Sequence, residues 1–167
     1  HATKVDGIKV SLLSAEKEIA MRRRLAPGVK MYTGDDFNYA ELIAGDALGY
    51  SHALLGIFDA IAPAASASLA AFAKGDVAAF NAILEPTVPL SRLIFKAPTR
   101  FYKTGVVFLA WLNGFQEHFL MLGGQQSARS LVHFAELFRL ADAARVLGDP
   151  ELAVHRMRQL LAVEGTD

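Results

Sequence analysis

The sequence predicts an α/β protein, and three observations support this prediction. Residues 1–62 alternate strand-like and helical runs, in the order that is typical of parallel βαβ units. From Pro63 onward the segments carry helical patterns. Three parallel strands alone leave two unpaired edges, which proteins rarely tolerate, so we expect a closed sheet whose earlier strands lie upstream of His1. The predicted fold is the C-terminal part of a (β/α)8 TIM barrel.

One domain is expected, in two consecutive parts. Residues 1–62 would supply the last three βα units, which are barrel strands six to eight with the intervening helices. Residues 63–167 would supply the last barrel helix and a helical C-terminal extension. The upstream half of such a barrel is not in this sequence.

The strands and helices are predicted from hydrophobic period and from capping residues. The predicted strands are residues 5–13, 29–33 and 53–58. The predicted helices are residues 14–25, 37–43, 64–73, 77–84, 88–95, 101–122, 127–147 and 150–163. Ser14 can cap the first helix, and Asp149 can cap the last one with Pro150 in its first turn.

Composition excludes several classes of partner. The 17 basic and 17 acidic side chains balance, so no global field favours nucleic acid or an anionic membrane. The apolar stretch at 104–124 is interrupted by Asn113, Gln116, Glu117 and His118, which favours a buried helix over a membrane span. With 53% hydrophobic residues the chain must bury much of its surface, and we expect a cytoplasmic homo-oligomer. No cysteine is present.

Lys9 is the first candidate for chemistry, because it lies in the middle of a predicted strand. It is either an edge-strand lysine that reaches solvent or a nucleophile. A nucleophilic lysine must be uncharged, which burial in a dry pocket favours. Gly7 and Ile8 could form a tight, dry wall, and Ser11 lies on the same strand face as Lys9.

A second candidate group follows the second predicted strand. Ligand-binding groups gather at strand ends in (β/α)8 barrels. Gly34 would allow close approach of a substrate, and Asp35 and Asp36 could accept hydrogen bonds from its hydroxyl groups. The alternative is an ordinary turn in which Asp36 caps the next helix.

These segments, in this order, resemble a known family. Residues 5–11 (VDGIKVS) resemble the Schiff-base strand of the dihydrodipicolinate synthase and N-acetylneuraminate lyase superfamily. Residues 32–36 (YTGDD) resemble the end of its next strand, and residues 53–63 resemble its eighth strand. Residues 74–105 are similar to its helical C-terminal section. The resemblance covers roughly residues 5 to 114, and the ordered series is more specific than any single motif.

The resemblance implies a class I aldolase or synthase. Lys9 would form an imine with pyruvate or a related 2-keto acid, and Gly34, Asp35 and Asp36 would contact the distal part of the substrate. Gly56 stands where relatives usually carry serine, so one hydroxyl contact is missing. The family's carboxylate-binding segment and proton-shuttling tyrosine belong to the upstream half. No metal or organic cofactor is implied.

Two functions follow from these residues. The first is a Schiff-base-forming lyase that acts on a keto acid. The second is a non-catalytic helical interaction or regulatory module derived from such an enzyme, an alternative motivated by Gly56 and by the missing upstream residues. A covalent keto-acid adduct at Lys9 distinguishes them.

Overall fold

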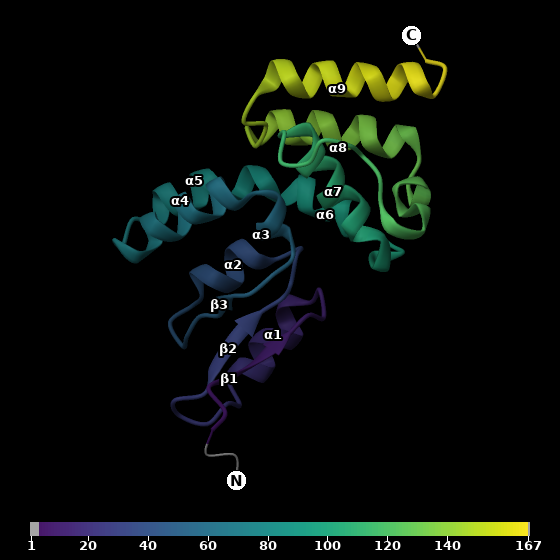
Figure 1. The fold of residues 1–167 in the computed structure, drawn as a ribbon. Helices are drawn as coiled ribbons and strands as arrows, with labels where there is room; N and C mark the ends of the chain where they lie inside the picture. The colour runs from purple at the N-terminus through teal and green to yellow at the C-terminus, as the bar shows by residue number, and fades with distance from the viewer. Residues whose placement is uncertain (1–3, 167) are drawn as a thin grey trace.

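The computed structural model describes residues 4–166, and helices make up most of it (Figure 1). The strands are β1 (Gly7–Val10), β2 (Lys30–Thr33) and β3 (His52–Ala53). The α-helices are α1 (Ala15–Arg22), α2 (Tyr39–Ala44), α3 (Ile57–Ala60), α4 (Ala62–Ala73), α5 (Val77–Leu84), α6 (Val88–Ile94), α7 (Tyr102–Leu112), α8 (Leu131–Ala143) and α9 (Pro150–Val163). The 3-10 helices are η1 (Glu85–Thr87), η2 (Thr99–Phe101) and η3 (Leu122–Ala128).

The sheet is small and parallel, with the strand order β1-β2-β3. Lys9 pairs with Tyr32 in the register of β1 and β2, and Tyr32 pairs in turn with His52 of β3. Among residues 4–166, no strand pairs with the outer edge of β1 or of β3. The three strands therefore end at one shared edge of an open sheet.

The prediction of the last three βα units of a (β/α)8 TIM barrel is wrong, although the α/β character of the N-terminal part is confirmed. The third strand is reduced to two residues, because the apolar run that follows it bends into α3. The Asp36 carboxylate accepts a hydrogen bond from the Ile57 backbone amide (2.7 Å), which fixes the start of that helix. A helical array, rather than further sheet, then forms most of the protein (Figure 1).

Capping predictions are confirmed at both ends of the chain. The Ser14 side chain accepts a hydrogen bond from the Lys17 amide at the start of α1. Asp149 accepts one from the Leu152 amide (3.0 Å) at the start of α9, with Pro150 as its first residue. A side-chain acceptor satisfies a backbone N–H that has no partner inside the helix.

One hydrophobic core joins Tyr39 and Ile43 of α2 to the buried side chains of the C-terminal helices. Phe108 is fully buried, and its ring lies 4.8 Å from that of Phe134 and 5.2 Å from that of Phe119 (ring centroids). Helices α8 and α9 lie side by side at the C-terminal end, with α7 packed against both (Figure 1). The apolar side chains after Pro63 are thus buried mainly by other helices rather than by the sheet.

The predicted helix over residues 101–122 is too long, because α7 ends at Leu112. Gly114 has a φ of +79°, in the left-handed region that ends many helices. The Arg156 guanidinium donates hydrogen bonds to the carbonyls of Trp111 and Gln116 and so fixes the exit of the chain. Within residues 4–166, no helix has both the length and the apolar character that a membrane crossing requires.

Candidate functional site

A cavity of about 230 Å³ opens where the three strands end. Its lining residues are Lys9, Ser11, Leu13, Gly34, Asp36, Gly56, Phe95, Thr99 and Tyr102. Five of the six residues predicted for the site therefore line one cavity, and Asp35 is the exception. Parallel strands place their carboxyl ends at one sheet edge, which explains why these segments meet there.

Gly34 is the position at which a side chain would disturb the candidate site most directly. A Cβ atom built on Gly34 would lie 2.2 Å from Ser11 Oγ and 2.6 Å from Lys9 Cε. The side chains of Lys9 and Ser11 thus cross directly over the end of β2. Glycine is needed here for close approach, as the sequence predicted, although the groups that approach are protein side chains.

Asp36 is a buried carboxyl group on the cavity wall, with 6% of its surface exposed. Burial raises its pKa from 3.8 to about 6, whereas the Ile57 amide and the positive charge of Lys9 oppose this increase. Its backbone carbonyl accepts a hydrogen bond from the Ser91 hydroxyl. Asp36 is therefore held on the wall by both its backbone and its side chain.

Asp35 has a structural role in the strand-to-helix turn. One carboxylate oxygen accepts hydrogen bonds from the Phe37 amide (2.8 Å) and the Asn38 amide (3.0 Å), and the other accepts one from the Asn38 side chain (2.8 Å). Its own amide donates to the Thr33 hydroxyl (3.1 Å). The residue is fully buried, so its oxygens serve the turn rather than the cavity. The sequence suggested Asp36 as a cap of the next helix, but the N-cap residue of α2 is Asn38, and Asp35 instead holds the turn before that helix.

Phe95 and Tyr102 form an aromatic wall of the cavity. The rings of Phe95 and Tyr102 stack with centroids 4.6 Å apart and planes 15° apart. A Cβ atom on Gly56 would lie 3.0 Å from Phe95 Cζ, so the aromatic ring occupies space beside this glycine. Gly56 allows Phe95 to pack here, and a serine at this position would crowd the ring.

Lys9 does not lie in the dry environment that the sequence suggested. The residue is exposed, and its strand β1 is an edge strand of the open sheet. Gly7 and Ile8 are themselves half-buried, so they do not seal the amine from water. Solvent reaches Lys9 because β1 has no further strand beside it among the described residues.

A family model described as "Protein of unknown function (DUF993)" matches residues 1–166. The chain belongs to the DUF993 family. No curated protein matches it.

In this DUF993 chain, sequence reasoning missed a buried polar cluster below the sheet edge. Glu18 of α1 is 1% exposed, and its carboxylate accepts a hydrogen bond from the Thr33 hydroxyl (2.9 Å). Burial raises the pKa of Glu18. Arg22, one turn further along α1, is half-buried and forms an ion pair with Asp46 (3.1 Å). Glu18 and Arg22 are four residues apart and therefore share one face of α1. This spacing of opposite charges was the feature of the sequence from which the cluster could have been predicted.

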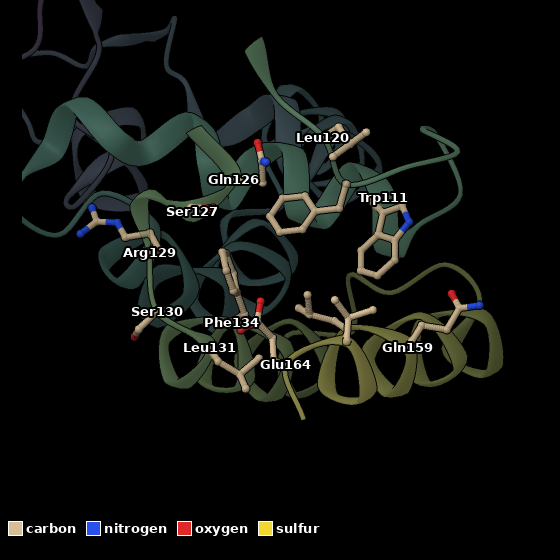
Figure 2. A pocket seen from close by; sticks show the side chains of 13 residues that line it. Trp111, Leu120, Gln126, Ser127, Arg129, Ser130, Leu131, Phe134, Gln159 and Glu164 are labelled. Carbon is tan, nitrogen blue, oxygen red and sulfur yellow. The ribbon is translucent and has the colours of Figure 1, made fainter. Parts of the chain in front are cut away.

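A second, larger cavity of about 520 Å³ lies among α7, α8, α9 and η3, away from Lys9 (Figure 2). Trp111, Phe119 and Phe134 form its aromatic part. Figure 2 shows the Arg129 guanidinium pointing away from Trp111 and Phe134. The part of the chain that the structure describes contains no group of three or more His, Cys, Asp or Glu side chains that could hold a metal ion.

Proposed function

We propose that this chain forms a Schiff base between Lys9 and the carbonyl carbon of pyruvate or a related 2-keto acid, as in the dihydrodipicolinate synthase superfamily that its sequence resembles. The observation that supports this function is the grouping of Lys9, Ser11, Gly34, Asp36 and Gly56 around one cavity. These five residues come from three segments that are well separated in the chain. Lys9, Ser11, Gly34 and Asp36 are the residues to which the sequence resemblance and the strand pattern assign this chemistry, and Gly56 replaces the serine that relatives usually carry.

The proposed reaction begins with proton transfer from the Lys9 ammonium group, through a bridging water, to the Asp36 carboxylate. The neutral amine then attacks the ketone carbon, so that a C–N bond forms and the carbon–oxygen π bond breaks. A proton moves from the nitrogen to the oxygen, which gives a carbinolamine. Asp36, whose pKa is about 6, then donates a proton to the leaving hydroxyl, and water and an iminium result. Because Lys9 is exposed, this proposal assigns the proton transfers to Asp36 rather than to desolvation of the amine.

The remaining lining residues would position the substrate. The Ser11 hydroxyl lies beside the Lys9 stem above Gly34, where it can donate a hydrogen bond to the carbinolamine oxygen. Thr99 adds a second hydroxyl, and the stacked Phe95 and Tyr102 rings cover the substrate from the other side. The iminium would withdraw electrons from the adjacent carbon, which makes aldol cleavage or condensation feasible.

The test is covalent trapping. The full chain is incubated with pyruvate and sodium borohydride, and the modified peptide is located by mass spectrometry. We expect one reduced adduct at Lys9, loss of that adduct in Lys9→Ala, and retention in Lys17→Ala, which removes an exposed lysine of α1 outside the cavity. Labelling spread over several lysines, or none at Lys9, contradicts the proposal.

A helical interaction module remains the competing function, and the exposure of Lys9 favours it. It predicts that neither pyruvate nor a larger 2-keto acid gives an adduct under these conditions. The same labelling experiment therefore decides between the two functions.

We also propose that the chain self-associates through its C-terminal helical part. Leu122 and Val163 are 95% and 83% exposed, and Phe115 is 79% exposed. Exposed apolar side chains of this size are typical of protein interfaces when they cluster. Light scattering at micromolar concentration tests the proposal, and a monomer throughout the concentration range contradicts it.

A further inference from the structure

We propose that Arg129 is a positioning residue for the aromatic wall of the Lys9 cavity. The inference rests on the proposed function, because it assigns to the helical part of the chain a role in keto-acid binding. It concerns the segment from Phe95 to Tyr102, which contributes three of the cavity's lining residues.

The Arg129 guanidinium holds three consecutive backbone carbonyls of that segment. It donates hydrogen bonds to the carbonyl oxygens of Lys96 (2.7 Å), Ala97 (3.3 Å) and Pro98 (3.1 Å). Its charge also lies 5.9 Å from the centre of the Phe101 ring. One side chain from the region before α8 thus fixes the turn that separates Phe95 from Tyr102.

Arg129 can act in this way because its own position is fixed. The Thr104 hydroxyl on α7 is buried and donates to the Gln125 carbonyl (2.9 Å), which anchors the preceding chain. Ser130 begins α8, and its side chain accepts from the His133 amide. Arg129 is therefore held between two anchored points, and its guanidinium reaches back toward the cavity wall.

The segment that Arg129 holds makes few other contacts with the rest of the fold. Residues 96–100 are exposed, and the Thr99 hydroxyl donates to the Phe95 carbonyl within the segment itself. Without the guanidinium, the Lys96–Pro98 carbonyls would lose a charged donor from another part of the fold. The planar guanidinium of arginine carries several N–H donors and can reach several carbonyls at once, whereas the ammonium group of lysine cannot reproduce that geometry.

The first test measures how the borohydride-trapped Lys9 adduct depends on pyruvate concentration. In Arg129→Met we expect the half-saturating pyruvate concentration to rise roughly tenfold, in line with the loss of charged hydrogen bonds. The trapping rate at saturation should stay within about twofold of wild type, because Lys9 and Asp36 are untouched. Arg129→Lys should lie between the two. Arg139→Met, on the exposed face of α8, is the matched control.

A second measurement keeps this inference separable from the proposed function. Trypsin can cut after Lys96 and Arg100. If Arg129 holds this segment in place, cleavage there should be at least about fivefold faster in Arg129→Met than in wild type or Arg139→Met. This measurement needs no substrate. Accelerated cleavage in a chain that forms no adduct would therefore contradict the proposed Schiff-base function but support the positioning role of Arg129. An unchanged cleavage rate in Arg129→Met, or a half-saturating pyruvate concentration equal to that of wild type, contradicts the positioning role of Arg129.

Discussion

Lys9 and Asp36 line one cavity from neighbouring strand ends, and they act on each other electrostatically. Burial of the Asp36 carboxyl raises its pKa to about 6, and the Lys9 charge limits that rise. An exposed amine and a carboxyl group that exchanges its proton near neutral pH therefore line the same cavity. Their shared position in this cavity is the physical basis of the proposed proton transfer.

Gly34→Ala should impair the site more than the fold. The new methyl group would meet the Ser11 hydroxyl and the end of the Lys9 side chain, which can move, and would lie 3.0 Å from the Val10 backbone carbonyl oxygen, so we expect a destabilisation of about 1–3 kcal/mol. Lys9 would be displaced, and the borohydride adduct should fall at least about tenfold. Gly148→Ala is the control, because its Cβ would have no atom closer than 3.6 Å. Equal adduct yields in the two variants would contradict the assigned role of Gly34.

Asp36→Asn should change how stability depends on pH. The folded protein keeps the Asp36 proton up to about pH 6, whereas the unfolded chain loses it near pH 3.8. The contribution of Asp36 to the free energy of unfolding therefore falls as pH rises through this window, by on the order of 2–3 kcal/mol. The variant should become more stable relative to wild type from pH 4 to pH 6. Urea unfolding across this range measures the difference, with exposed Asp59→Asn as control.

His133→Leu should give the opposite pH dependence. His133 is buried, and neither ring nitrogen has a hydrogen-bond partner among the described residues. Burial, then the charges of Lys96 and Arg129, lower its pKa from 6.5 to about 4. Between about pH 6.5 and pH 4 the unfolded chain binds a proton at His133 and the folded chain does not. The free energy of unfolding of wild type therefore decreases with decreasing pH, by on the order of 3 kcal/mol. In His133→Leu this decrease should be absent. A variant that follows wild type from pH 7 to pH 4 would disprove the assignment.

Phe108→Ala should be strongly destabilising. Phe108 is fully buried, and three aromatic rings lie within 6.0 Å of its own, centroid to centroid. Truncation leaves a cavity and should cost about 3–5 kcal/mol in the free energy of unfolding. Phe115→Ala, at a residue that is 79% exposed, should cost less than about 0.5 kcal/mol. Chemical denaturation of both variants checks the contrast, which a small effect at Phe108 would refute.

Asp149→Ala tests the cap of the last helix. The Leu152 amide would lose its acceptor, and we expect a loss of about 1 kcal/mol, or a melting temperature lower by roughly 2–4 °C. Asp142→Ala removes an exposed carboxylate of α8 that caps no helix and should leave the melting temperature unchanged. Similar shifts in both variants would show that charge, rather than capping, is responsible.

Local features were predictable from the sequence because they depend on neighbouring residues. Ser14 and Asp149 cap the helices that follow them, and helices α5 and α9 have the predicted bounds. The candidate site residues were predicted differently, from residue type and from the resemblance to the aldolase superfamily, and parallel pairing of β1 with β2 brings Lys9 and Gly34 to one cavity. The family match adds membership in DUF993, and the keto-acid chemistry stays a prediction.

Long-range contacts decided the rest. The sequence by itself determined the caps, the parallel direction of the strands and five of the nine residues that line the cavity. Only the tertiary structure decided that Asp36 starts α3 and shortens β3, that Asp35 serves the turn, and that Lys9 is exposed. The physical reason is that hydrogen-bond partners and solvent exposure depend on segments that pack from far along the chain, which a local pattern of residues does not encode.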